Sequence, residues 1–153
     1  MSEHQATISW QRDGAAFIDG KFARRHTWSF DGGVTVSGSP APSVVPPPLS
    51  DPAAVDPEEA FVASLASCHM LFFLALAAKK RFLVDSYRDE AIGTLAKRPD
   101  GKMWMERVTL RPAVTFSGDK QPTAEEIDAL HHQSHGLCYI SNSVTTEVTI
   151  EPR

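Results

Sequence analysis

The sequence has little cysteine. Its 153 residues include two, Cys68 and Cys138, which lie 70 residues apart with no Cys-x-x-Cys motif. Two cysteines are too few for a disulfide-stabilised scaffold. The sequence therefore predicts thiols that act singly or as one pair.

A basic segment is also absent. Fifteen lysines and arginines stand against 19 acidic residues, which gives a net charge of -4. This balance argues against nucleic acid or a membrane as the main partner. The first residues, MSEHQATISWQRDG, lack the basic-then-apolar pattern of a signal peptide, so we expect a cytoplasmic location. Length and a hydrophobic content of 42% predict a single domain, residues 1–153, with its own core.

Short strands are expected in the first forty residues. Alternating apolar segments are separated by Gly-containing turn signals, which predicts strands at residues 6–10, 17–20, 24–30 and 34–38. Asp31-Gly32-Gly33 predicts a hairpin between the last two. Seven of the eleven prolines follow, within residues 40–57. Proline fixes φ and lacks the N–H, so we expect a stiff loop at residues 40–55 that covers part of the domain.

A long helix is predicted to follow this loop. Asp56 is suited to cap it, Pro57 to begin it, and Glu59 to complete a capping box. The segment from Ala60 to Ala78 is apolar on almost every side. It is long enough to span a bilayer, but small polar residues at its middle favour burial between two subunits of a homodimer.

The rest of the chain predicts strands around a second helix. Residues 87–98 and 106–118 are expected to form two long strands joined at Pro99-Asp100-Gly101. A capping box, Thr123 to Glu126, predicts a helix ending near His135, with Gly136 as its stop. Residues 143–151 predict a last strand. The order of elements predicts an α+β fold with antiparallel sheets.

Both cysteines have an ordinary interpretation as small core residues. Cys68 lies in the middle of the predicted helix, so a thiolate there needs a cation supplied by another element. Cys138 follows a helix end, where the chain can turn a side chain back toward the core.

The histidines offer a competing hypothesis. His131 and His135 have the i,i+4 spacing of helical metal ligands, with His132 between them. Together with His69 and the two cysteines they could form a zinc site. The Glu of a His-Glu-x-x-His motif is missing, which weakens this interpretation.

Two motifs resemble those of the OsmC/Ohr family. The first is Asp56-Pro57-Glu58-Glu59-x-Phe-x-Ala-x-x-Ala-x-Cys68, and the second is Cys138-Tyr139-Ile140-Ser141-Asn142-Ser143-Val144. Their separation and the order of elements also match. The chain departs from the usual pattern where Ser67-Cys68-His69-Met70 replaces Ala-Cys-Phe and Ala60 replaces Leu.

The resemblance implies a fold, an assembly and an activity. The family is built of antiparallel sheets around a long buried central helix, as an intertwined homodimer. It reduces organic hydroperoxides with thiols, without metal or organic cofactor, and is reset by a reductant such as lipoamide, thioredoxin or glutathione. A non-catalytic, ligand-binding or metal-binding dimeric domain is the alternative function.

Roles follow from the matching positions. The resemblance makes Cys68 the peroxidatic thiol, Cys138 the resolving thiol, Glu58 the site carboxylate and Arg24 the activating cation, with Arg25 as rival. Ten residues separate Glu58 from Cys68, which is about 15 Å along a straight helix. We therefore expect Glu58 to serve the site of the partner subunit.

Overall fold

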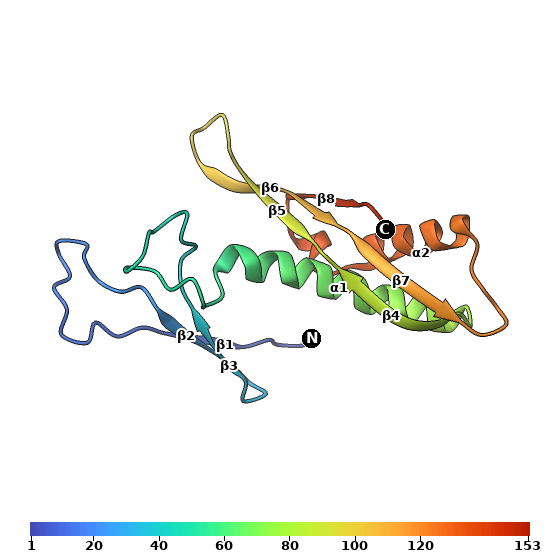
Figure 1. The fold of residues 1–153 in the computed structure, drawn as a ribbon, viewed down its shortest axis with the longest axis horizontal. Coiled ribbons are helices and arrows are strands. Elements are labelled where there is room, and N and C mark those ends of the chain that lie inside the picture. Colours follow the sequence, from blue (N-terminus) through green and yellow to red (C-terminus); the bar gives the residue numbers. More distant parts are fainter. The chain divides into compact units, whose positions relative to one another are not determined.

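The computed structural model describes residues 1–153, which form two compact units, Met1–Ala60 and Phe61–Arg153 (Figure 1). The first contains a three-stranded antiparallel sheet of order β1-β2-β3, with strands Ala6–Ser9, His26–Phe30 and Thr35–Gly38. The predicted hairpin is confirmed. Its turn is closed by the Phe30 N–H, which donates to the Val34 carbonyl at 2.9 Å, and Gly33 supplies a φ of 84°.

The predicted strand at residues 17–20 is wrong. These residues form a turn in which the Gly20 N–H donates to the Phe17 carbonyl at 3.0 Å. Gly20 adopts a φ of 74°, and the Asp19 carboxylate accepts from the Lys21 N–H at 3.0 Å. The Asp-Gly pair therefore reverses the chain instead of ending a strand.

The proline-rich segment is a loop, as predicted. Backbone hydrogen bonds fix it to the strands: Arg24 donates to the Leu49 carbonyl at 2.9 Å, and Ser39 to the Val55 carbonyl at 3.0 Å. Asp51 adds two contacts, since its N–H donates to Ser39 Oγ at 2.8 Å and its carboxylate pairs with Arg25 at 3.2 Å.

Helix α1 spans Pro57–Lys79 and begins at the predicted capping box. The Glu59 N–H donates to the Asp56 carboxylate at 2.7 Å, and the Asp56 N–H donates to the Glu59 carboxylate at 3.2 Å. The helix ends before Arg81, whose φ of 63° breaks the helical path.

The single chain buries only one stripe of α1. Leu65, His69, Phe73 and Ala77, spaced four residues apart, are buried, whereas Leu71 is 60% exposed. One chain therefore leaves part of α1 uncovered, and burial of the rest between two subunits stays a prediction. By length and composition alone, α1 could also cross a membrane, with a mean hydropathy of 2.0 over the most apolar 18 residues. Core helices of globular proteins meet the same criterion.

The second unit continues with a bent hairpin of four strands. These are β4 (Leu83–Asp89), β5 (Ile92–Lys97), β6 (Met103–Leu110) and β7 (Pro112–Ser117). β4 pairs with β7 and β5 with β6, all antiparallel. Each of the two long strands predicted here is thus divided in two. At the bend the Arg111 N–H donates to the Asp89 side chain at 2.6 Å, and Pro112 has no N–H to continue a ladder.

Helix α2 and the last strand complete the second unit. α2 spans Ala124–Leu137 and has the predicted capping box, but it continues past Gly136, so the predicted stop is two residues early. A short 3-10 helix, η1 (Ser141–Ser143), precedes β8 (Glu147–Ile150), which is shorter than expected and pairs parallel to β6. The α+β class with antiparallel sheets is confirmed, with this one parallel pairing added.

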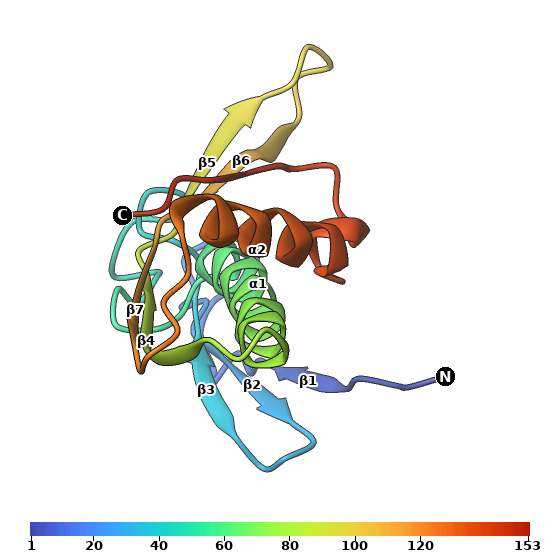
Figure 2. The same cartoon turned by 90° about the vertical axis from the view of Figure 1, so that its right-hand side faces the viewer.

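Two apolar clusters hold α1 in the second unit. One joins Phe73 and Ala77 to Leu130 of α2, and the other joins Leu65 to Val108 and Leu110 of β6. Figure 2 shows α2 passing beside α1 while β4 and β7 run along another side. This packing places the middle of α1 next to the chain that leaves α2.

Candidate functional site: a pair of thiols between two helices

The segment after α2 holds Cys138 in a fixed position. Cys138 is the fully buried C-cap of the helix, and its N–H donates to the Ser134 carbonyl at 2.9 Å. Its sulfur accepts from the Ser141 N–H at 3.4 Å, and its carbonyl accepts from the Asn142 N–H at 3.0 Å. The turn therefore orients the thiol through backbone groups on both sides.

Cys68 faces this turn from α1, so the structure brings the two predicted thiols together. Both cysteines are free, and Cys68 is partly exposed. The two thiols lie close enough for each to shift the pKa of the other. The ring of Phe72 on α1 also meets the Tyr139 ring edge-on, with centroids 5.1 Å apart.

The two thiols differ in acidity. Burial raises the pKa of Cys68, and Cys138 raises it further, while the backbone of Ile140 and Tyr139 works in the opposite direction. Burial also opposes ionisation of Cys138, but the hydrogen bond from Ser141 and the neighbouring Cys68 thiol outweigh this and lower the pKa. Cys138 is thus the more readily ionised thiol of the unit.

This order of acidity has a consequence for Cys68. None of the groups that shift its pKa is a cation. A thiol with a raised pKa is largely protonated at neutral pH and is a weak nucleophile. None of these groups therefore stabilises a Cys68 thiolate through a positive charge.

Arg24 and Arg25 lie in the first unit with different environments. The Arg24 guanidinium stacks on Phe22 at 4.3 Å and donates to the Phe22 and Gly20 carbonyls at 3.0 and 3.2 Å. Arg25 instead pairs with Asp51 and donates to Ser37 Oγ at 3.1 Å. Arg24 has no carboxylate partner in the chain, so its charge remains available to a ligand or to another acidic group.

Arg24 lines an apolar hollow of about 370 Å³. The other residues around it are apolar or aromatic apart from one histidine: Ile8, Trp10, Phe22, His26, Pro40 and Pro57. Pro40 begins the proline-rich loop, and Pro57 is the first residue of α1. The loop therefore contributes Pro40 to the wall of a hollow that contains one cation, which suits an apolar ligand with a polar group.

Glu58 lies in the first turn of α1 and is half-buried. It precedes Cys68 by ten residues on one continuous helix, a rise of about 15 Å. Within a chain, the helix thus keeps the carboxylate and the thiol apart, as expected from their spacing.

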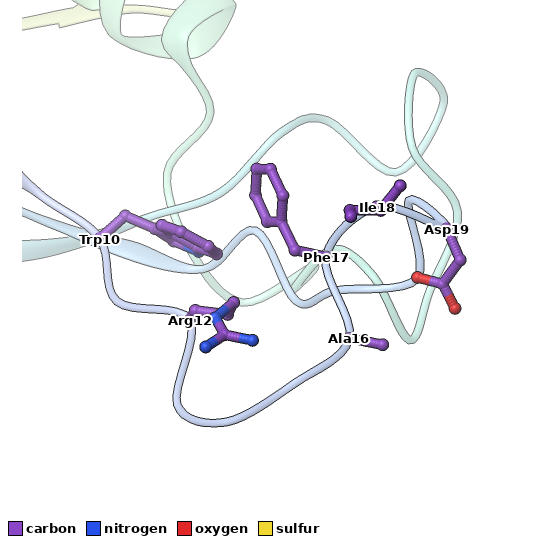
Figure 3. A pocket seen from close by; sticks show the side chains of 6 residues that line it. All are labelled: Trp10, Arg12, Ala16, Phe17, Ile18 and Asp19. Atoms are coloured by element: carbon purple, nitrogen blue, oxygen red, sulfur yellow. The ribbon is translucent and has the colours of Figure 1, made fainter.

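A second hollow, which was not predicted from the sequence, adjoins Trp10. It measures about 850 Å³ and is formed by the loop between β1 and β2, where Trp10 and Phe17 point toward each other beside Arg12 (Figure 3). The ring centroids of Trp10 and Phe17 are 5.8 Å apart, and Ile18 is fully exposed. An aromatic residue on each side of an Arg-Asp-Gly turn was the available signal.

The histidines do not form the hypothetical zinc site. His69 and His131 are buried and joined by a hydrogen bond of 3.0 Å between Nε2 and Nδ1, while His132 is exposed. No group of three or more His, Cys, Asp or Glu side chains in residues 1–153 is placed to hold a metal ion. His131 and His135 share a helix, but His131 is engaged with His69.

The buried histidines predict an acid-labile fold. Burial, helped by His131 and His135, lowers the pKa of His69 to about 4, and burial lowers that of His131 to about 4 against the opposing effect of Asp128. The unfolded chain, with histidine pKa values near 6.5, therefore binds more protons between pH 6.5 and 4. The free energy of unfolding should fall by about 2 kcal/mol or more from pH 7 to 4.5.

Urea denaturation at the two pH values measures this loss. The variant His69→Phe/His131→Leu should lose much less stability on acidification than the wild type. The exposed neighbour provides the control, because His132→Gln should retain the wild-type difference. An equal loss in the double variant would contradict the assignment.

These features define an α+β protein with a pair of cysteines set between two helices. Residues 50–153 match the family described as OsmC-like protein, and the chain belongs to this family. No curated protein matches the sequence.

Solved structures share the whole fold. An OsmC-like protein of unknown function from Vibrio cholerae is 53% identical, with a TM-score of 0.98 and full coverage of both chains. An organic hydroperoxide resistance protein OsmC from Legionella pneumophila is 16% identical, with a TM-score of 0.70 over 99% of this chain and 96% of its own. The organic hydroperoxide resistance protein OhrB of Bacillus subtilis is 19% identical, with a TM-score of 0.69 over 99% and 98%. At these last two identities the likeness shows the fold alone.

Proposed function

We propose that the protein is a thiol-dependent peroxidase that reduces organic hydroperoxides to alcohols. Family membership supports a redox or peroxidase-like function in general. The observation that carries the specific proposal is the meeting of Cys68 and Cys138, 70 residues apart in sequence, closely enough to shift each other's pKa.

In the proposed reaction the Cys68 thiolate attacks the O–O bond of the hydroperoxide. The sulfur takes one oxygen and becomes a sulfenic acid, and the alkoxide leaves and takes up a proton to give the alcohol. The Cys138 thiolate then attacks this sulfur, which forms a disulfide and expels hydroxide, and the hydroxide takes up a proton to give water. A dithiol reductant such as lipoamide, or thioredoxin or glutathione, restores both thiols by exchange.

The assignment of Cys68 as the attacking thiol rests on access. Cys138 is fully buried, whereas Cys68 is partly exposed and can meet a peroxide. Cys138 has the lower pKa, which suits the second step, since it attacks the sulfenic acid as a thiolate. The low intrinsic acidity of Cys68 makes the proposed reaction dependent on Arg24, which Glu58 of a second subunit would orient.

Titration of free thiols during treatment with one equivalent of cumene hydroperoxide tests the function. We expect rapid loss of two thiols per chain, one equivalent of cumyl alcohol, and recovery of both thiols with dihydrolipoamide. Retention of both thiols would overturn the proposal and favour a non-catalytic domain that binds an apolar ligand.

We also infer a homodimer, because one chain leaves an apolar side of α1 uncovered. Leu71 is 60% exposed in the middle of this helix. An apolar helix face that is exposed in one chain is normally covered by another subunit. Sedimentation at micromolar concentration should give a species of twice 16.7 kDa. A folded monomer under these conditions would contradict the inference.

A further inference from the structure

His69 and His131 form an unusual contact in the second unit. The two rings are stacked, with centroids 5.3 Å apart and planes 10° from parallel, and their nitrogens lie 3.0 Å apart. This is the one side-chain hydrogen bond between α1 and α2. Both side chains are buried, and the ring of Phe73 packs on His131 at 4.5 Å.

Stability does not account for this pair. The outer nitrogens, His69 Nδ1 and His131 Nε2, are buried and have no hydrogen-bond partner. A buried polar atom without a partner costs free energy, so two apolar side chains of similar size would serve packing better. Two histidines add directionality instead, since a hydrogen bond fixes distance and angle where apolar contacts tolerate sliding.

The two histidines lie near the two cysteines on the same helices. His69 directly follows Cys68 on α1, and His131 precedes Cys138 by two turns of α2. The helix leads into Cys138 without a break, because the Cys138 N–H donates to the Ser134 carbonyl. A shift of one helix along the other at the histidines would therefore move one sulfur past the other.

We propose that the His69–His131 hydrogen bond is a positioning element that keeps Cys68 and Cys138 in register for disulfide formation. The inference rests on the proposed function. Disulfide geometry requires the two Cα atoms to lie within about 4.4–6.8 Å of each other, so small displacements of the helices suppress closure. His69 and His131 are thus positioning residues that act through the two cysteines.

The relative position of the two cysteines determines which of two reactions the Cys68 sulfenic acid undergoes. In one, the Cys138 thiol condenses with Cys68 sulfenic acid to give the disulfide and water. In the other, a second hydroperoxide transfers an oxygen to the sulfenic acid, which gives the sulfinic acid and an alcohol. Loss of the hydrogen bond should slow the first without affecting the second.

The test measures how readily the disulfide closes, independently of peroxide. Each variant is equilibrated with mixtures of reduced and oxidised glutathione, and the effective concentration of the two thiols is obtained from the fraction of Cys68–Cys138 disulfide. The variants His69→Phe and His131→Phe should lower it by about tenfold or more. The amide variants His69→Gln and His131→Asn, which offer a donor or acceptor at the positions of Nε2 and Nδ1, should restore much of the loss.

Leu130→Val is the matched control. Leu130 lies next to His131 on α2 and belongs to the apolar cluster that contains Phe73 and Ala77 of α1. It forms no side-chain hydrogen bond with α1. It should lower the stability while leaving the effective concentration within about twofold of wild type. The double variant His69→Phe/His131→Leu leaves no buried imidazole without a partner, and it replaces any single variant that does not fold.

The same variants are then given excess cumene hydroperoxide, and sulfinic acid on Cys68 is counted by mass spectrometry. We expect more sulfinic acid per turnover in the phenylalanine variants than in Leu130→Val. Wild-type effective concentrations in folded phenylalanine variants would overturn the inference, as would an equal loss in Leu130→Val. A wild-type protein that closes the disulfide with glutathione but ignores peroxide would overturn the proposed function alone.

Discussion

Replacing Cys68 with serine should abolish the consumption of organic hydroperoxide, and replacing Cys138 with serine should leave a single round of reduction. The expected difference follows from access and connectivity. Cys68 is the partly exposed thiol, so it receives the peroxide oxygen, whereas Cys138 is buried behind the turn at Ser141. Without Cys138 no thiol of the same unit can condense with the sulfenic acid.

The products distinguish the two cysteines. In Cys138→Ser we expect one equivalent of alcohol per chain, followed by sulfenic and then sulfinic acid on Cys68. In Cys68→Ser, Cys138 should remain reduced despite its lower pKa, because it is not exposed to the peroxide. Mass spectrometry of peptides containing each residue measures both outcomes. Oxidation of Cys138 first, in the wild type or in Cys68→Ser, would reverse the assigned roles.

Replacing Arg24 with methionine should slow the first oxidation of Cys68 about 100-fold at pH 7. Burial raises the pKa of Cys68, and no cation within its own unit compensates, so the loss of the activating charge reduces the thiolate population. The rate should recover as the pH rises toward the pKa of the unactivated thiol. Recovery of the rate at high pH indicates that only the activation of the thiol was lost, because a misfolded variant would stay slow at every pH.

Arg25→Met is the matched control. Arg25 is the neighbouring residue and carries the same charge, but its guanidinium is already paired with Asp51. We expect a change of no more than about threefold in the oxidation rate. Single-turnover measurements in the Cys138→Ser background isolate this step. A larger loss in Arg25→Met than in Arg24→Met would make Arg25 the activating residue.

Mixed dimers test where Glu58 acts. On one continuous helix, Glu58 and Cys68 are separated by a rise of about 15 Å, so we propose that Glu58 supports the site of the partner subunit. Subunits carrying Cys68→Ser and subunits carrying Glu58→Ala should each be inactive as pure dimers. A heterodimer of the two has one intact site and should regain about half of the wild-type activity. Absence of complementation in verified heterodimers would place Glu58 within its own subunit or in the helix cap alone.

Local structure followed closely from the sequence. The capping boxes at Asp56 and Thr123 fix where α1 and α2 begin, because their hydrogen bonds involve residues three positions apart. The Asp31-Gly32-Gly33 turn and the proline-rich loop depend equally on local backbone preferences. The two cysteine motifs and their spacing were also sufficient to indicate the family.

The errors have both distant and local causes. The predicted strand at residues 106–118 is divided at Arg111, whose N–H is taken by Asp89, 22 residues earlier. Helix α2 continues through Gly136, since Cys138 supplies a C-cap by donating to Ser134. Glycine alone does not end a helix when the following residues satisfy the last carbonyls.

The sequence by itself determined the helix starts, the main turns, the α+β class and the pair of cysteines, because each depends on neighbouring residues or on motif spacing. Only the tertiary structure decided which thiol is the more acidic, since Ser141 and the burial of both sulfurs set that order. It alone also placed His69 against His131, and so removed them from a metal site. The two histidines are 62 positions apart and the two cysteines 70, and side-chain packing between α1 and α2, which no local pattern encodes, brings them together.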